Sequence, residues 1–457
     1  MAPIPSSPDA AGAVLRPLAI AVLWAALCAC RTQASGGARQ QQKPETPMSD
    51  AFVSVWDKQP VPAEEPARPI TPAGPPAAGW ARAVPERTVA ARAFLTEERN
   101  SRLAGALPAG GAWRVRWTHD VSQGVLPAWV LTAGTRIVVQ GEGMWELLDT
   151  DGGRIRTGVF AAEAIALDPE RALFYAVGTG SEIVARNLAD GEKAFYFALT
   201  FGKKYARQYL ARPDGRFIAL SVEQVIDPHA PGAPNTSMVE TVTLPERPVV
   251  DSMSGHASAP VSGHLFHQSV VLAGAVRGGA VAVATENRLT YADIQLKIRR
   301  HFSGEFVPVS LSLDEGGRAY MLVNAGGRRA LWVVTPAGER AAAAELPDEA
   351  REAAHPPIVG YDHTVYVLGA DRVYAYAPDG SPRWQSAPGA RPAGAAVTAD
   401  DRLLASVGSR LVAFAPGGEP AVLHEFPGEQ LRTAPVMTAA GEILVASRGK
   451  LYCLTRE

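Results

Sequence analysis

The sequence predicts an all-β protein, an eight-bladed β-propeller preceded by a segment that does not belong to the ring. Short apolar stretches that fit β-strands return about every 40 residues through most of the chain. Glycine (43) and proline (37) are frequent among the 457 residues, which indicates many turns between short elements. The hydrophobic fraction of 47 % is enough for a large core and excludes wholesale disorder.

Charge and cysteine content narrow the functional class. The 44 basic and 46 acidic residues give a net charge of −2, which argues against a dedicated nucleic-acid binder. The three cysteines, Cys28, Cys30 and Cys453, are too few for a disulfide framework. We expect Cys453 to be a small buried apolar residue in a terminal strand.

The first residues, 1–29, are typical of a lipoprotein signal peptide. Pro17–Leu27 is an apolar run of 11 residues after Arg16, too short to cross a bilayer but long enough for a signal-peptide core. The run ends in Leu27-Cys28-Ala29-Cys30, which resembles the lipobox of bacterial lipoproteins. That resemblance implies cleavage before Cys30, lipidation of Cys30 and, because Arg31 follows, an outer-membrane destination. An ordinary signal peptide cut near Ala29 and an uncleaved anchor are the alternatives.

Two segments separate this N-terminus from the predicted ring. Residues 30–88 are rich in proline and glutamine, so they bury too little apolar surface to fold and are predicted to be a flexible tether. Residues 89–110 are predicted to be a short helical lead-in, because Val89–Leu107 holds helix-forming residues. No later run of about 18 apolar residues follows.

The repeat occupies residues 111–457. Its clearest copies are Pro357–Trp384, Gly394–Gly418 and Ala434–Leu454, whose central strands begin 38 and 40 residues apart. Eight central strands can be placed in all, near Ile137, Leu173, Phe217, Val281, Ala319, Val365, Leu403 and Ile443. Such units bury both faces of each sheet only when they pack around an axis. The long interval after Phe217 predicts an insertion at 227–274, or else an extra strand pair that matches the repeat poorly. Seven blades would result if 217–284 formed one blade.

Ring closure is predicted from the start of the repeat. The alternating run Trp113-Arg114-Val115-Arg116-Trp117 precedes the first unit, and the last unit ends without a fourth strand. We expect this run to supply that strand, with the tryptophans on one face and the arginines on the other. An independent edge strand is the alternative.

One repeat copy resembles a known family. The segment from Ala375 through Gly380 to Trp384 resembles the A-x-D-x-x-G-x-x-x-W repeat of quinoprotein-like (pyrroloquinoline-quinone-repeat) β-propellers, with Ala377 at the Asp position. Arg156 and Val422 stand where two other copies would carry the tryptophan. The resemblance implies either quinone-dependent dehydrogenases or non-catalytic lipoproteins such as the propeller subunit of the outer-membrane β-barrel assembly machinery. Adjacent cysteines and a C-x-x-C-H haem site, typical of the dehydrogenases, do not occur.

Three groups of residues are candidates for a functional site. His229, His256, His264 and His267 lie in the insertion near Asp251, but a metal needs three or four converging ligands and loop histidines are usually solvated. Asp149–Gly153 lacks the fifth-position ligand of a calcium loop and is predicted to be a turn between strands. A funnel over the ring axis could be lined by Arg207, Tyr209, Arg299 and Arg300.

We therefore expect a non-enzymatic scaffold with Cys30 as its lipidation site and no catalytic, cofactor or metal residues. It would bind a protein partner at the bacterial cell envelope through loops and blade edges, as a monomeric propeller facing the periplasm from the outer membrane. The alternative is an enzyme or small-ligand binder, either quinone-dehydrogenase-like or carbohydrate-active, with a site at the central funnel. A sensor domain is a third possibility that the sequence does not separate from the first.

Overall fold

The computed structural model describes residues 103–457 apart from 104, 108–109, 123–126, 128, 142, 160–164, 169–170, 178–181, 199–205, 212–215, 222–236, 244–260, 268–270, 278–279, 294, 315 and 354. These residues all belong to one of the chain's two compact units, Thr71–Glu457. The other unit, Met1–Ile70, lies outside the described residues. So do the predicted signal peptide 1–29, Cys30 and the tether 30–88.

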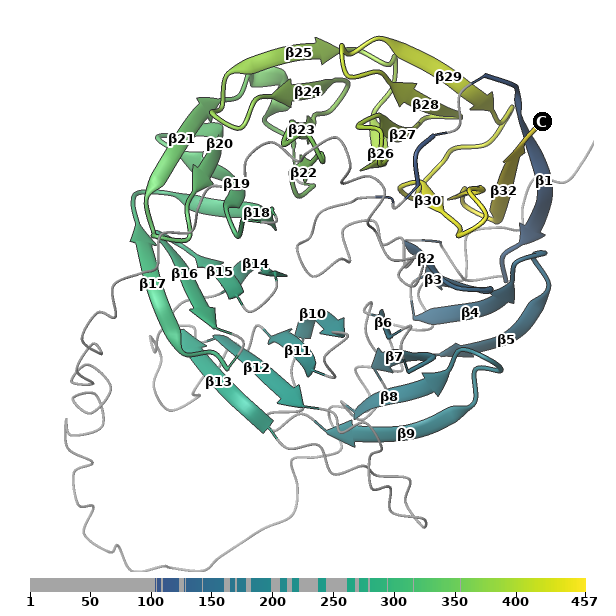
Figure 1. Cartoon of the computed structure of the whole chain (residues 1–457), viewed down its shortest axis with the longest axis horizontal. Coiled ribbons are helices and arrows are strands. Elements are labelled where there is room, and N and C mark those ends of the chain that lie inside the picture. The colour runs from purple at the N-terminus through teal and green to yellow at the C-terminus, as the bar shows by residue number, and fades with distance from the viewer. Residues whose placement is uncertain are drawn as a thin grey trace, which may run out of the picture. The chain divides into compact units, whose positions relative to one another are not determined.

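The described residues form eight four-stranded antiparallel sheets (Figure 1). The first four sheets in chain order are β2 (Trp129–Ala133), β3 (Arg136–Gly141), β4 (Met144–Asp149), β5 (Arg154–Val159); β6 (Ile165–Asp168), β7 (Leu173–Val177), β8 (Glu182–Asn187), β9 (Lys193–Ala198); β10 (Ala206–Ala211), β11 (Arg216–Ser221), β12 (Ser237–Thr243), β13 (Val261–His267); and β14 (Val271–Arg277), β15 (Ala280–Thr285), β16 (Arg288–Asp293), β17 (Ile298–Ser303).

The remaining sheets follow the same pattern, and the last one also takes the first strand of the chain. They are β18 (Val307–Leu313), β19 (Ala319–Ala325), β20 (Arg328–Val334), β21 (Arg340–Glu345); β22 (Ile358–Val359), β23 (Val365–Leu368), β24 (Val373–Tyr376), β25 (Pro382–Ser386); β26 (Pro392–Val397), β27 (Leu403–Val407), β28 (Arg410–Phe414), β29 (Pro420–Glu425); and β30 (Val436–Met437), β31 (Ile443–Ala446), β32 (Lys450–Arg456), β1 (Trp113–Asp120). A short 3-10 helix, η2 (Asp348–Ala350), follows β21.

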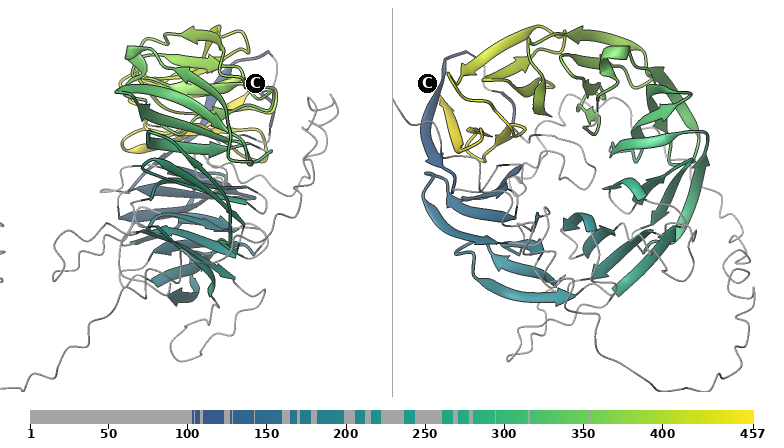
Figure 2. Two further views of the ribbon diagram at one scale, coloured as in Figure 1. Left: turned by 90° about the vertical axis from the view of Figure 1, so that its left-hand side faces the viewer. Right: turned by 180° about the vertical axis from the view of Figure 1, so that it is seen from behind.

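The sheets are the blades of a ring, with the first strand of each near the axis and the last at the rim (Figures 1 and 2). Contacts between neighbouring sheets run all the way round, through the pairs β6–β10, β11–β14, β14–β18, β18–β22, β22–β26, β29–β1 and β30–β2. The sheets β2–β5 and β6–β9 share an apolar cluster that includes Trp145 and Phe174. The predicted propeller class is thereby confirmed.

Burial within a blade explains why the repeat is visible in the sequence. In β19, Ala319 to Val323 are all fully buried, because this strand has a neighbouring blade on each face. In β21, half-buried and exposed positions alternate from Ala341 to Glu345, because this strand lies at the rim. Continuous apolar runs therefore mark the middle strands and alternating runs mark the outer ones.

The predicted ring closure is confirmed. β1 pairs antiparallel with β32 from Trp113 opposite Arg456 to Asp120 opposite Lys450, which adds the N-terminal strand to the last blade. The pairing shifts between Val115 and Trp117, so the strict alternation predicted for this strand is interrupted at Arg116.

Of the two predictions for residues 227–274, the insertion is wrong and the extra strand pair is confirmed. These residues include β12 and β13, which pair with each other and complete the sheet that begins with β10 and β11. Phe217 and Val281 lie in different sheets, on β11 and β15, so the single blade considered for 217–284 does not form. The pair matches the sequence repeat poorly because the intervals 222–236 and 244–260, before β12 and between β12 and β13, are long.

The predicted lead-in helix does not extend into the described residues of 103–110. Leu103 is fully buried, and its N–H donates to the carbonyl of Val397. Gly105 accepts from the N–H of Ala399, and the N–H of Leu107 donates to Asp400. These backbone groups bond to the blade β26–β29 instead of to one another, so a helix cannot form there. Among the described residues, no helix has the length and apolar character needed to span a membrane.

Candidate functional site

A recurring turn joins the third and fourth strands of several blades. In the turn 149–153, the Gly152 N–H donates to the Asp149 carbonyl and the Asp149 N–H to the Gly153 carbonyl. The turns 377–381 and 415–419 have the same two bonds. Each carries glycine at its fourth position with a positive φ, 81° at Gly152, 82° at Gly380 and 94° at Gly418. The Asp-Gly segment 149–153 is thus a turn, as predicted.

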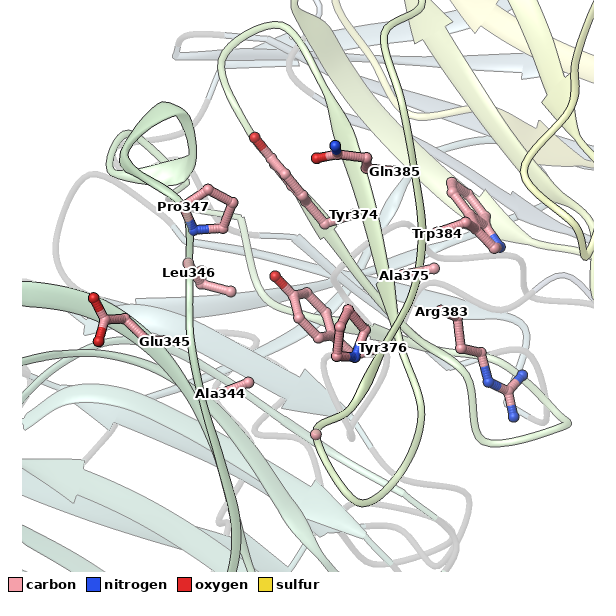
Figure 3. Close-up of a pocket in the computed structure, with 12 residues that line it drawn as sticks. Ala344, Glu345, Leu346, Pro347, Tyr374, Ala375, Tyr376, Arg383, Trp384 and Gln385 are labelled. Carbon is pink, nitrogen blue, oxygen red and sulfur yellow. The ribbon is translucent and has the colours of Figure 1, made fainter.

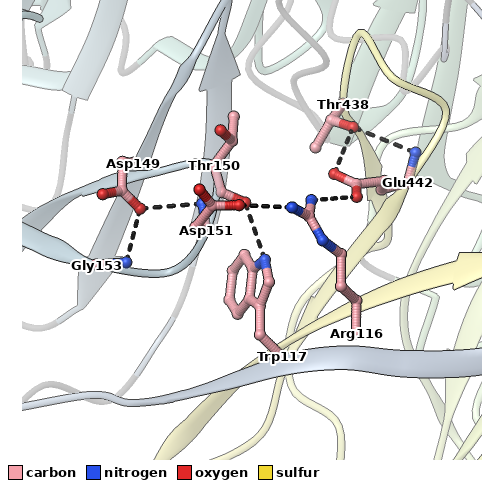
Figure 4. Close-up of polar contacts among 8 residues, drawn as sticks. All are labelled: Arg116, Trp117, Asp149, Thr150, Asp151, Gly153, Thr438 and Glu442. Carbon is pink, nitrogen blue, oxygen red and sulfur yellow. Dashed lines mark hydrogen bonds and ion pairs between the residues drawn. The ribbon is translucent and has the colours of Figure 1, made fainter.

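At two blade interfaces, an indole from the preceding rim strand packs on this turn. Trp384 Nε1 donates to the Pro416 carbonyl at 2.8 Å, and a Cβ at Gly418 would lie 2.6 Å from Trp384. Trp117 Nε1 donates to the Thr150 carbonyl at 2.9 Å, and a Cβ at Gly152 would lie 2.8 Å from the Trp117 ring (Figure 4). The indole fits only because the turn residue has no side chain.

Trp117 was not recognised as a counterpart of Trp384 from the sequence. It precedes the turn it contacts by 33 residues and belongs to the last blade only through ring closure. Arg116, beside it, reaches Asp151 at 2.5 Å and Glu442 at 2.6 Å, so β1 ties the last blade to the first (Figure 4). The register shift at Arg116 lets both side chains point toward one turn, which strict alternation would not allow.

A third interface lacks the indole. On β21 the position four residues after the turn glycine is Ala342, where β25 has Trp384. A Cβ on Gly380 would meet the methyl groups of Ala342 at 3.4 Å and Ala344 at 3.6 Å and the Ala343 backbone at 3.7 Å, so β21 itself fills the place of the indole. A groove with a volume of about 770 Å³ lies beside them (Figure 3). It is lined by Ala344, Glu345, Leu346, Pro347, Tyr374, Ala375, Tyr376, Gly380, Pro382, Arg383, Trp384 and Gln385.

The groove is mostly apolar, with one unsatisfied polar group. Leu346 and Tyr376 are buried, and Tyr374 is only 3 % exposed. The Tyr374 hydroxyl is buried and has no hydrogen-bond partner within the described part of the chain. Burial raises the pKa of Tyr374, so the hydroxyl stays protonated and can donate. At the rim, Glu345 pairs with Arg328 and Arg383 with Asp362.

A buried carboxylate lies between the closing strand and the first blade. Glu146 on β4 is fully buried; its Oε2 lies 2.9 Å from His119 Nε2, and its Oε1 accepts from the Ser122 N–H at 2.7 Å. Arg154 approaches to 3.7 Å. Burial alone would raise the pKa of Glu146, but these hydrogen bonds and the Arg154 charge outweigh it and lower the pKa. The cluster holds β1 against the first blade.

The structure separates the other candidate residues. Arg207 and Tyr209 lie on β10, whereas Arg299 and Arg300 lie on β17, the rim strand of the next sheet, so the four do not line one funnel (Figure 1). Arg299 instead pairs with Asp293 on its own blade.

The histidine group is also dispersed. His264 and His267 lie on β13 rather than in a loop, in register with Glu240 and Ser237. His229, Asp251 and His256 lie outside the described residues. Within the described part of the chain, no three His, Cys, Asp or Glu side chains are grouped as metal ligands.

Cys453 occupies the place expected for it. It is fully buried on β32, opposite Trp117 of the closing strand. Burial, with Glu442 nearby, raises the pKa of Cys453 to about 12, so the thiol remains protonated and behaves as an apolar group.

Comparisons with known proteins agree on the fold. The chain is similar to the crystal structure of BamB from Moraxella catarrhalis, with a TM-score of 0.51 and 9 % identity, over 76 % of this chain and 98 % of that one. It is also similar to the computationally designed Ika8 protein, with a TM-score of 0.55 and 11 % identity, over 74 % and 98 % of the two chains. No profile of a known protein family matches the sequence. No curated protein sequence matches it either.

The fold is therefore a BamB-like β-propeller. At these identities the likeness establishes the architecture and does not transfer a role.

Proposed function

We propose that this protein is a non-enzymatic scaffold, anchored by lipid on Cys30 to the periplasmic face of the outer membrane, that binds an envelope protein. The observation that carries the proposal is a closed ring with an open apolar groove at its rim, on a chain whose N-terminus contains Leu27-Cys28-Ala29-Cys30. Concave apolar surfaces rimmed by polar groups are typical binding sites for protein segments.

Two further observations support the finer parts of this proposal. The fold is like that of BamB, and Arg31 follows the lipobox-like cysteine, which together favour a role in outer-membrane assembly. A funnel enzyme or small-ligand binder gains no support from the residues that were candidates for it, because they lie on two different sheets.

The anchor is tested by mass spectrometry of the full-length protein extracted from membranes. We expect an N-terminal peptide that begins at lipid-modified Cys30. Cys30→Ser should remove the lipid and release the protein from the membrane fraction, whereas the matched control Cys28→Ser should not. An unmodified Cys30 in the membrane-extracted protein would refute the anchor.

The scaffold is tested by cross-linking in intact cells followed by purification of the full-length protein. We expect the same envelope protein to be recovered repeatedly, and its recovery to fall when Cys30→Ser removes the chain from the membrane. Absence of any reproducible partner would refute the scaffold role.

A further inference from the structure

The rim strand β21 presents an unguarded sheet edge. It is the last strand of its blade, so within the described residues it pairs only with β20, and it lies at the outside of the ring (Figure 1). Its interior is Ala341–Ala344, whose methyl side chains leave the backbone accessible. An exposed strand edge carries unpaired N–H and C=O groups that can pair with another strand.

The neighbouring rim strands carry features that discourage such pairing. Arg299 and Arg300 project from the interior of β17. The strands β25 and β29 begin with Pro382 and Pro420, which have no backbone N–H to donate. Among the rim strands that the structure describes, β21 alone has small side chains throughout its interior.

Two opposite charges flank the alanines on one face of β21. Arg340, Ala343 and Glu345 are paired with every second residue of β20, so their side chains lie on the same face, and all three are exposed. The Arg340 guanidinium lies 4.7 Å from the centre of the Trp332 ring. Glu345 pairs with Arg328. Contacts within the blade thus hold a positive charge at one end of the strand and a negative charge at the other.

This strand is complementary to a second copy of itself. When two copies of β21 run antiparallel about a two-fold axis through Ala343, alanines lie opposite alanines at the centre. The same arrangement brings Arg340 of each copy to Glu345 of the other, because the register shift at Ala341 shortens that end of the strand by one residue. The small residues let the two backbones approach, and the opposite charges at both ends fix the register.

We propose that this protein forms a two-fold dimer in which β21 of one copy pairs antiparallel with β21 of another. The paired segment is short, so the dimer is weak, with a Kd on the order of 100 µM. At low micromolar concentrations the chain is mostly a monomer, in line with the expectation from the sequence. The inference goes beyond the proposed scaffold function, since the dimer needs neither the lipid nor an envelope protein.

The test is sedimentation equilibrium of the chain from residue 31 at concentrations from about 10 µM to about 1 mM. We expect the mass to rise from that of a monomer toward that of a dimer. Ala343→Lys, at an exposed position, places two like charges together at the two-fold axis and should weaken the dimer at least about tenfold. The matched control Arg299→Glu, on the rim strand β17, should leave the Kd unchanged.

A charge exchange between copies tests the register. Arg340→Glu alone sets Glu against Glu345 of the second copy, and Glu345→Arg alone sets Arg against Arg340, so each variant should dimerise at least about tenfold more weakly than the wild type. An equimolar mixture of the two variants restores opposite charges at both ends and should form a heterodimer. Circular dichroism of each variant checks that it is folded.

Three outcomes would overturn the proposal. A wild-type chain that stays monomeric at about 1 mM would leave the edge of β21 to a different protein. Folded single variants that dimerise as tightly as the wild type would place the dimer contact elsewhere. A mixture of Arg340→Glu and Glu345→Arg that stays monomeric, while the wild type dimerises, would exclude the antiparallel register.

Discussion

Glu146 illustrates how single residues hold the ring closed. It is a fully buried carboxylate whose partners come from β1, from the chain after β1 and from the neighbouring strand β5. An isolated buried charge would be strongly destabilising, and these contacts make the ionised form acceptable. The residues next to Glu146 in the sequence do not indicate that it is buried and paired, because His119, Ser122 and Arg154 contact it only in the closed ring.

We predict that Glu146 gives the protein part of its acid sensitivity. Its pKa is lowered from the ordinary 4.5, so the unfolded chain binds its proton more tightly. The contribution is complete above about pH 4.5 and is lost as the pH falls through the lowered native pKa. Urea unfolding between pH 3 and 7 should show a shallower acid slope for Glu146→Gln than for the wild type. The exposed control Glu419→Gln should keep the slope, and equal slopes for all three proteins would contradict the prediction.

We predict that Trp117→Phe and Trp384→Phe each lower the free energy of unfolding by about 1–2 kcal/mol, because each loses an indole hydrogen bond and part of a packed ring. Guanidinium unfolding measures the effect. Val422→Ala is the control at the corresponding position of β29, where the side chain is 51 % exposed, and should change stability by less than about 0.5 kcal/mol. A loss at Val422 equal to those at the tryptophans would show that the indole contacts add nothing.

At the scale of elements, the blade-to-blade contact consists of a turn and the rim strand before it. The sequence from Ala375 to Trp384 shows the two residues that make this contact, a turn glycine and a rim-strand tryptophan, because Gly380 and Trp384 match a repeat signature. What Trp384 contacts could not be read from it, since its partner turn 415–419 belongs to the next blade. The sequence left open whether 227–274 holds an insertion or a strand pair, because the long intervals around β12 and β13 hide their period.

We predict that Gly152→Ala destabilises the protein by about 1–3 kcal/mol more than Gly441→Ala. The two glycines have nearly equal φ values, 81° and 79°, so the backbone strain of alanine is similar. A Cβ at Gly152 would lie 2.8 Å from Trp117, whereas nothing lies within 4 Å at Gly441. Thermal and chemical unfolding measure the difference, and equal losses would show that the indole moves aside at no cost.

For the whole molecule, closure removes the free edge that the last blade would otherwise expose. β1 covers the edge of β32 along seven paired positions and contacts β29 of the preceding blade. Unpaired strand edges template association with other chains, so a closed ring resists self-association.

We predict that a chain starting at residue 121, without β1, unfolds at lower denaturant concentration and self-associates, compared with a chain starting at 103 that retains it. The edge of β32 and the buried Leu451 to Leu454 would then be open to other molecules. Size-exclusion chromatography with light scattering and urea unfolding measure both effects. A monomer with an unchanged unfolding midpoint would show that β1 is dispensable.

The sequence by itself determined the propeller class, the closing strand and the turn that begins at Asp149, because these depend on local periodicity and turn residues. Only the tertiary structure decided that residues 103–107 bond to another blade, that Arg116 and Trp117 reach one turn, and that β21 leaves a groove beside Tyr374. Each of these depends on which blades become neighbours and on how their strands register. A sequence pattern does not contain this information, because the contacting residues are far apart in the chain and become neighbours only when the blades pack into the ring.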